Sequence, residues 1–271
     1  MFRFDNDSLF LKRIEKQDDN LKEKFIHADI AGFKDEYQAY RDEFHNPGDL
    51  KKDLHVYDLN ADGKNDLIFT GESGGEPREV AFILNTSSGF RVVFKSFQYV
   101  WGLDFDHNKI STIYIKDDGC CADYVDFNKI YHVDYTKDEP EFNLTYVSAN
   151  IHNATFPKRH FSKPIYFQVI NNNYKLRSDP VINDKDSVGY GGDMHLGNTI
   201  GLLTKGTWGR AIGESKDSTG RVWWFVELEP EANIKESVFY EDEGTKRKAA
   251  KMGWISSRYV KLLISKKAEL L

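Results

Sequence analysis

The chain has 271 residues, of which 40% are hydrophobic, 30% charged and 14% aromatic, a composition typical of folded globular proteins and unlike that of disordered chains. This length predicts two modest domains, and the formal net charge of -6 argues against sequence-independent binding to nucleic acid, which needs a basic surface. The apolar runs are far shorter than the roughly 20 residues that span a bilayer, so no membrane insertion is expected.

The first seven residues do not combine a charged start with an apolar core, so they do not form a signal peptide. We therefore expect a periplasmic or secreted protein if a signal peptide was removed, and a cytoplasmic one otherwise.

Residues 10–45 have the spacing of one or two amphipathic helices, with Lys, Asp and Glu between the apolar positions. The apolar residues with this spacing are Leu21 and Phe25, then Tyr37, Tyr40 and Phe44. Helix is predicted to stop at 45–48, because Pro47 and Gly48 do not continue one.

Oxygen-bearing side chains stand at positions one, three, five and nine of the segment 58–66, and these are Asp58, Asn60, Asp62 and Asp66. Calcium takes about six to eight oxygen ligands, which a chain folding around the ion can supply from alternate residues. Gly63 at position six permits a sharp bend, and Lys64 at position seven would contribute its carbonyl. We therefore predict a structural Ca²⁺ site with Asp58, Asn60, Asp62, Lys64 and Asp66 as ligands. The alternative is an Asx-rich turn without an ion.

The segment is not an EF-hand, because the position of the bidentate Glu is occupied by Phe69 in a run that reads as a strand. It resembles instead the calcium loop of FG-GAP/VCBS repeats, found in integrin-type propellers and many bacterial surface proteins, including the following Leu67 and Ile68. The resemblance implies a metal that joins a loop to its strand. It covers one repeat, so a complete seven-bladed propeller is excluded by length. A catalytic metal is disfavoured because the loop closes its own ligand set.

Residues 54–147 contain short apolar stretches separated by turns, which predicts an antiparallel meander. The predicted strands are 67–69, 80–84, 90–94, 110–115, 129–133 and 142–147. In the strand at 129–133, alternation predicts that Tyr131 and Val133 share one face while His132 is on the other, and one of the two faces is expected to be wet. Residues 148–164 are polar, contain two prolines and show no period, so an interdomain linker is predicted there.

Residues 165–271 form a second predicted β-region, with a charged loop at 241–248 that we expect to be solvated. Its predicted strands are 165–169, 174–177, 199–203, 210–214, 221–228, 253–256 and 260–263. The segments 174–180, 220–226 and 253–260 resemble a bacterial SH3-like (SH3b) domain, from which the long insertion at 229–252 departs. The predicted fold is thus mainly β with a helical amino-terminal segment (α+β): a VCBS-like domain at 1–147, a linker at 148–164 and an SH3-like barrel at 165–271.

Trp223 and Trp224 are neighbours on a predicted strand, so their side chains point to opposite faces. We expect one to be in the core. The other, taken as Trp224, would pack against the neighbouring domain or form a ligand platform, with domain packing favoured. Tyr190 and His195 are further candidate ligand-binding residues, and core packing is preferred for Trp254.

No catalytic residue is predicted, because the sequence lacks GxSxG, HExxH, P-loop and dinucleotide motifs. Cys120 and Cys121 are adjacent, so they cannot join distant parts of this chain, and two reduced thiols are favoured over a redox pair. We expect a non-enzymatic bacterial binding protein, outside the cytoplasm, that recognises cell-wall peptide, glycan or protein. The alternative is an immunity or inhibitor protein whose acidic surface neutralises a basic bacterial toxin.

Overall fold

The structure is a computed structural model, and it describes residues 15–28, 47–72, 78–118, 123–136, 140–152, 154–190, 193–242 and 247–263. The chain divides into two compact units, one formed by 1–121 with 128–146 and the other by 122–127 with 147–271. Strands dominate both units and helices are few, which confirms the prediction of a mainly β protein. No helix within the described ranges is long and apolar enough to span a membrane.

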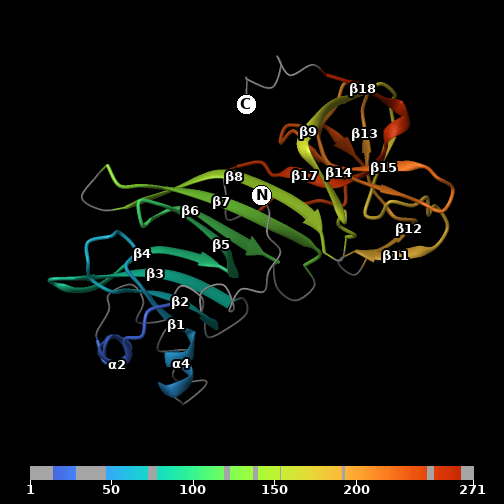
Figure 1. The fold of residues 1–271 in the computed structure, drawn as a ribbon. Helices are drawn as coiled ribbons and strands as arrows, with labels where there is room; N and C mark the ends of the chain where they lie inside the picture. The colour runs from blue at the N-terminus through green and yellow to red at the C-terminus, as the bar shows by residue number, and fades with distance from the viewer. Residues whose placement is uncertain are drawn as a thin grey trace. The chain divides into compact units, whose positions relative to one another are not determined.

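Within its described residues, the first unit has two helices and eight strands or parts of strands (Figure 1). They are α2 (Asp19–Ile26), α4 (Pro47–Asp53), β1 (Leu54–Tyr57), β2 (Asp66–Glu72), β3 (Arg78–Thr86), β4 (Gly89–Phe97), β5 (Tyr99–Asp106), β6 (Lys109–Asp117), β7 (Val125–Asp134) from residue 128, and β8 (Glu141–Ile151) to residue 146. Every predicted strand of this region lies within β2, β3, β4, β6, β7 or β8. The last residue of the predicted strand 142–147 belongs to the second unit.

The first unit is layered, with β1–β4 as the middle layer (Figure 1). Val80 and Phe82 of β3 join a core that includes side chains of β5 and β6, while Ala81 and Ile83 join a second core beneath α2. Because neighbouring side chains of a strand point to opposite faces, this burial on both sides explains the continuous apolar run at 80–84. The predicted alternation in β7 is confirmed, since His132 is exposed and Val133 is buried.

The amino-terminal helical prediction is confirmed in part. Leu21 and Phe25 are buried on α2, whose first turn is capped by the Asp18 carboxylate at 3.0 Å from the Leu21 N–H. Tyr37, Tyr40 and Phe44 lie outside the described residues, as do Cys120 and Cys121. The expected helix end at 45–48 cannot be compared, because residues 29–46 lie outside the described ranges, but α4 begins at Pro47 where a β-region was expected to follow. Proline suits the first turn of a helix, where a backbone N–H has no partner within the helix.

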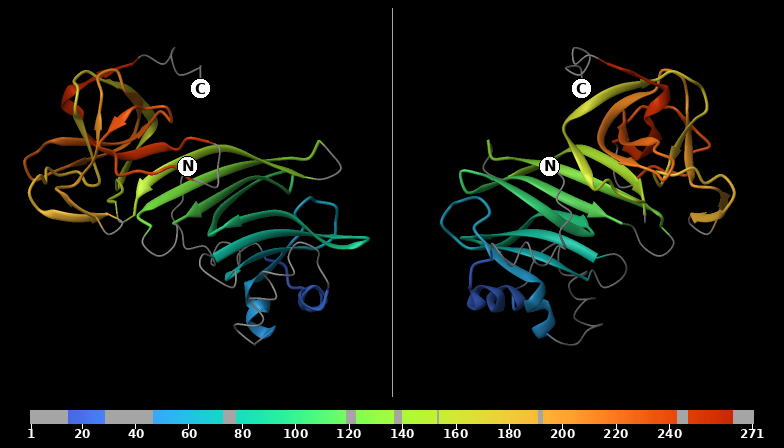
Figure 2. Two further views of the ribbon diagram at one scale, coloured as in Figure 1. Left: turned by 180° about the vertical axis from the view of Figure 1, so that it is seen from behind. Right: turned by 45° about the vertical axis from the view of Figure 1, so that its right-hand side comes forward.

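The second unit is built almost entirely of strands, which curve around a shared interior (Figure 2). They are β9 (Arg159–Val169), β10 (Tyr174–Arg177), β11 (Ser187–Tyr190), β12 (Asp193–Leu196), β13 (Thr199–Leu203), β14 (Trp208–Lys216), β15 (Val222–Leu228), β16 (Ile234–Lys235), β17 (Ala250–Ser256) and β18 (Val260–Leu262), with the 3-10 turn η1 (Ser257–Tyr259) and the remaining parts of β7 and β8. Neighbours follow the order β18-β9-β14-β15-β17, and β10 then joins β17 to β13 and β16.

The core of the second unit contains Trp223, Phe225, Met252 and Trp254. Trp254 is fully buried and its indole N–H donates to the Thr155 carbonyl at 2.6 Å, in agreement with the preferred core position. Pairing is antiparallel except where β17 meets the end of β8 in parallel. Between the described strands the pairings form an open path that does not close into a barrel.

The predicted linker at 148–164 differs from the structure, in which β8 continues to Ile151 and β9 begins at Arg159. Polar residues without a period predict a linker, but a strand with one exposed face also carries many polar side chains. Arg159 and His160 lie within the predicted linker, but both are paired with β14 as part of β9, so this part of the segment belongs to a sheet.

Candidate binding site

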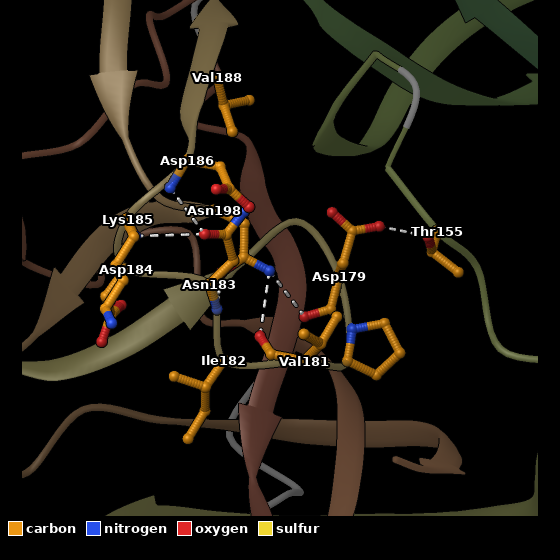
Figure 3. Close-up of a pocket in the computed structure, with 11 residues that line it drawn as sticks. Thr155, Asp179, Val181, Ile182, Asn183, Asp184, Lys185, Asp186, Val188 and Asn198 are labelled. Carbon is orange, nitrogen blue, oxygen red and sulfur yellow. Dashed lines mark hydrogen bonds between the residues drawn. The ribbon is translucent and has the colours of Figure 1, made fainter. Parts of the chain in front are cut away.

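A loop between β10 and β11 forms one wall of a pocket of about 890 Å³ on the second unit (Figure 3). The lining residues that the argument uses are Asp179, Val181, Ile182, Asp186 and Val188, joined by Thr155 from another segment. Apolar and acidic side chains therefore meet on one concave surface, the arrangement expected of a site that binds an organic ligand by burial and orients it by charge.

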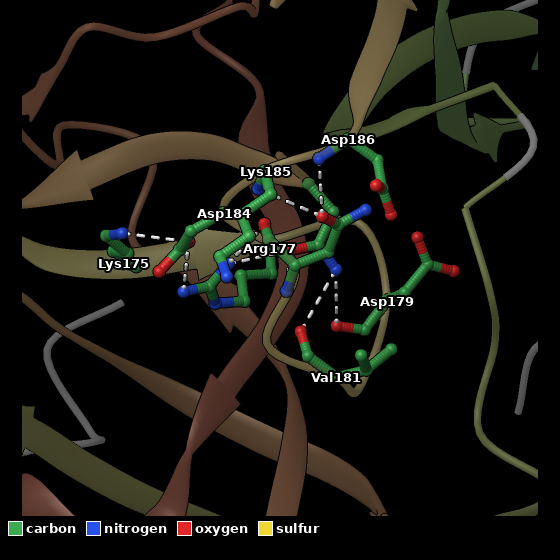
Figure 4. A network of polar contacts seen from close by, with 9 residues as sticks. Lys175, Arg177, Asp179, Val181, Asp184, Lys185 and Asp186 are labelled. Carbon is green, nitrogen blue, oxygen red and sulfur yellow. Dashed lines mark hydrogen bonds and ion pairs between the residues drawn. The ribbon is translucent and has the colours of Figure 1, made fainter. Parts of the chain in front are cut away.

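The loop is held from beneath by the guanidinium of Arg177, at the end of β10 (Figure 4). The Arg177 residue is only 4% exposed, and its nitrogens donate to the Asn183 carbonyl at 3.2 Å, to Asn198 Oδ1 at 2.7 Å and to Asp184 Oδ1 at 2.9 Å. A planar guanidinium with several fixed donors suits this task. The hydrogen bond from Lys175, with that from Arg177, holds the pKa of the Asp184 carboxyl below its ordinary value.

Two further contacts fix the loop against the segment that follows β12. Asn198 is buried and its side-chain amide donates to the Val181 carbonyl at 3.1 Å, while its backbone N–H donates to the Asn183 carbonyl at 2.9 Å. Gly197 has a φ of +76°, and a Cβ there would stand 2.2 Å from the Asn183 carbonyl oxygen. Glycine is thus required at this position both by the backbone angle and by the close approach of two chain segments.

Four large apolar side chains in this part of the chain are exposed to solvent. Val181 and Ile182 are 44% and 50% exposed, and Met194 and Leu196 on β12 are 69% and 73% exposed. Single exposed apolar residues are ordinary, but these four fall within sixteen consecutive positions of the chain. The register of the β11–β12 hairpin pairs Gly189 with Met194 and Ser187 with Leu196, so small residues stand beside the two large ones. The surface formed by the described residues 179–190 and 194–196 is called the 179–196 surface below.

Two of the three predicted ligand-binding residues, Tyr190 and His195, lie on the β11–β12 hairpin. Their ring centroids are 5.4 Å apart, and neither is among the described residues that line the pocket. Tyr190 is buried, which raises the pKa of its phenol, so it supports the hairpin from beneath and offers little surface to a ligand. His195 is half-buried.

Trp224 does not line the pocket. It is half-buried on β15, with the rings of Phe161 and Phe167 at centroid distances of 6.4 Å, and its neighbour Trp223 is in the core. The prediction that the pair points to opposite faces, with one member buried, is confirmed. The outward member packs on aromatic rings of its own unit.

The sequence did not predict the residues that form the pocket wall as binding residues. Asp179 and Pro180 belong to the segment 174–180 that resembles an SH3b domain, and no binding role is predicted for them or for Val181 and Ile182. One signal was present: two adjacent β-branched apolar residues in a loop rich in Asp and Asn have no structural role there unless they are covered.

The predicted calcium loop lies between β1 and β2 in the first unit, and its oxygens turn inward. Asp58 accepts the backbone N–H of Asp62 at 3.1 Å and of Gly63 at 3.0 Å through its two carboxylate oxygens. Asn60 accepts the Asp62 N–H at 3.1 Å, and Asp62 accepts the Lys64 N–H at 2.8 Å. Gly63 has a φ of +85°, as the predicted sharp bend requires.

Asp66 closes the loop. It is 1% exposed, and its two oxygens accept the N–H of Leu59 at 2.9 Å and of Asn85 at 2.8 Å, which joins the loop to the end of β3. Burial, opposed by these two hydrogen bonds, raises the pKa of Asp66 to about 6. The Leu59 carbonyl in turn accepts the Tyr135 hydroxyl at 3.0 Å, so the loop is tied to a second layer of the unit as well.

The loop suits a hard cation in its donor chemistry but not equally at all five predicted positions. Asp58, Asn60, Asp62 and Asp66 all accept backbone N–H groups, but Asp66 is buried, whereas Asp58 and Asn60 are half-buried and Asp62 is exposed. Within the described ranges, no three His, Cys, Asp or Glu side chains are grouped so as to hold a metal. A cation here would therefore depend also on Asn60 and on the Lys64 carbonyl.

No protein-family model, no curated protein and no solved structure matches this chain.

Proposed function

We propose that this chain is a non-enzymatic binding protein that recognises a peptide segment of its partner through the 179–196 surface of the second unit. The observation that carries the proposal is a pocket whose exposed apolar residues stand on a loop that is already held in place by the buried Arg177. A preorganised loop loses less conformational entropy on binding than a mobile one, so its exposed side chains are available for affinity.

Among the predicted classes of ligand, peptide or protein is favoured over glycan. Val181 and Ile182 offer aliphatic surface, and among the described residues that line the pocket there is no aromatic side chain onto which a sugar ring could stack. A peptide offers aliphatic side chains that fit such a surface. This preference narrows the cell-wall hypothesis to its peptide component.

We also propose the finer fold assignments. The second unit is an SH3-like domain of bacterial type, supported by β10 and β13, which coincide with the predicted 174–177 and 199–203, and by the buried Trp254. The first unit is a VCBS-like domain in which calcium, held by Asp58, Asn60 and Asp62, braces the loop onto β2. Its occupation would be favoured outside the cytoplasm, where calcium sites of about 10⁻⁴–10⁻³ M dissociation constant are filled.

The experiment is a selection from a random peptide library against the full chain, followed by affinity measurement of the selected peptides. We expect the double variant Val181→Ser/Ile182→Ser to bind them at least about tenfold more weakly, since two buried apolar contacts are lost. The matched control Ile170→Ser/Leu262→Ser removes two exposed apolar residues elsewhere on the second unit and should bind as the wild type does. Selected peptides that bind both variants equally well would contradict the proposal.

A further inference from the structure

The pocket contains two carboxylates, Asp179 and Asp186, whose charge is not neutralised by a described cation. Asp179 accepts hydrogen bonds from the hydroxyls of Ser178, at 2.6 Å, and of Thr155. These donors are neutral, so the negative charge stays. Asp186 is exposed, and its backbone N–H, not its carboxylate, is engaged by Asn183 at 3.0 Å.

The neighbouring cations are occupied elsewhere. Lys175 and Arg177 both contact Asp184, each at 2.9 Å, on the side of the loop away from Asp179 (Figure 4). Lys185 lies on that same side in Figure 3, whereas the carboxylates of Asp179 and Asp186 are directed toward one shared space beside Thr155. The loop therefore has two different sides. On one side Asp184 is paired with cations, and on the other Asp179 and Asp186 line the pocket.

The acidic side adjoins an apolar wall formed by Pro180, Val181, Ile182 and Val188. A lysine or arginine side chain matches this combination, because its methylene groups can lie on apolar surface while its charged end reaches a carboxylate. An acidic ligand would be repelled by the same two groups, so the arrangement selects against it as well as for its opposite.

We infer that the 179–196 surface takes a basic peptide segment, in which a lysine or arginine enters the space between Asp179 and Asp186 and an adjacent apolar residue contacts Val181 and Ile182. This inference rests on the proposed function and names its partner: a protein segment that is cationic and apolar together. The toxin-inhibitor hypothesis requires a basic partner, and this surface has the chemistry to receive one.

The test uses three synthetic peptides of one length and one apolar pattern, in which the remaining positions are all lysine, all glutamine or all glutamate. Binding to the full chain is measured by calorimetry at low and high salt, and the contact surface by chemical shift changes. We expect the lysine peptide to bind at least about tenfold more tightly than the glutamate peptide, with a preference that weakens as salt rises. The shifted resonances should include 179–188.

Substitutions of Asp179 and Asp186 test whether these two carboxylates cause the preference for the lysine peptide. Asp179→Asn/Asp186→Asn should reduce lysine-peptide binding to the level of the glutamine peptide, and Asp179→Lys/Asp186→Lys should reverse the preference toward glutamate. Glu231→Gln/Glu236→Gln removes two charges elsewhere on the second unit and should leave the preference unchanged. If all three peptides bind equally and lose affinity in Val181→Ser/Ile182→Ser, the proposed function stands and this inference fails. If none binds, or if the lysine peptide contacts another surface, both are overturned.

Discussion

Two loops of similar composition, 58–66 in the first unit and 179–186 in the second, use their Asp residues in different ways. In the first loop the carboxylates and amide turn inward, and Asp58 and Asp62 accept backbone N–H groups of the loop itself. In the second, an arginine and a buried asparagine do the internal bonding, so that Asp179 and Asp186 are left for the pocket. Acidic composition therefore does not by itself distinguish a loop that folds around its own oxygens from one that presents them.

The source of the internal donors explains the difference. The 58–66 loop relies on its own backbone N–H groups, which become available because Gly63 permits a tight bend. The 179–186 loop is supported by side chains from outside it, above all Arg177, and can therefore carry apolar residues at its tip. The predictions below test this contrast, beginning with the largest effect.

Arg177→Met should destabilise the second unit by ~4 kcal/mol, because it removes three hydrogen bonds that a buried, charged guanidinium donates to Asn183, Asp184 and Asn198. Denaturant unfolding followed by tryptophan fluorescence measures this, since Trp208, Trp223, Trp224 and Trp254 lie in that unit and only Trp101 in the other. Lys175→Met, which removes a partly exposed ion pair, should cost less than ~1 kcal/mol. Equal effects of the two changes would mean that the loop does not depend on the buried arginine.

Gly197→Ala should cost ~3 kcal/mol and weaken peptide binding, because the added Cβ meets the Asn183 carbonyl oxygen and the φ is positive. Gly206 is the matched control: its φ is also positive, at +94°, but nothing lies within 4 Å of its Cβ position. Gly206→Ala should therefore show the backbone cost alone, about 1 kcal/mol. Urea midpoints of the two variants compare them directly.

Calcium should stabilise the first unit by ~2.7 kcal/mol at about a hundred times its dissociation constant, through binding to the folded state. Calorimetric melting with calcium and with chelator measures the shift. Asp58→Ala/Asp62→Ala should abolish it and leave the second unit folded, whereas Asp106→Ala, an exposed acid of the same unit, should preserve it. An unchanged melting temperature in millimolar calcium would contradict the calcium site and favour the alternative, an Asx-rich turn without an ion.

Tyr190→Phe should have the smallest effect, less than ~1 kcal/mol on stability and none on peptide affinity. Its hydroxyl makes only a long contact of 3.5 Å with Ser178 Oγ, and the buried ring is retained. Isothermal calorimetry with a selected peptide provides the measurement. A tenfold loss of affinity would show that the tyrosine hydroxyl reaches the ligand, as the sequence had suggested.

By itself the sequence determined the β character, the position of most strands and the tight bend at Gly63, because these follow from alternation, turn residues and glycine, all local properties. It did not reveal β5, whose Gly102 and Asp104 weaken the strand pattern, or the strands within 148–164, where polar residues resembled a linker.

Only the tertiary structure decided which acidic residues face outward. Asp184 and Asp186 are two positions apart in one loop, yet the first is paired with Lys175 and Arg177 and the second is directed to the pocket. Likewise, Asp66 could be a ligand by spacing, but its burial against Leu59 and Asn85 commits it to backbone hydrogen bonds. Spacing along the chain gives the chemistry that a residue offers, whereas its partners come from segments brought close only by folding.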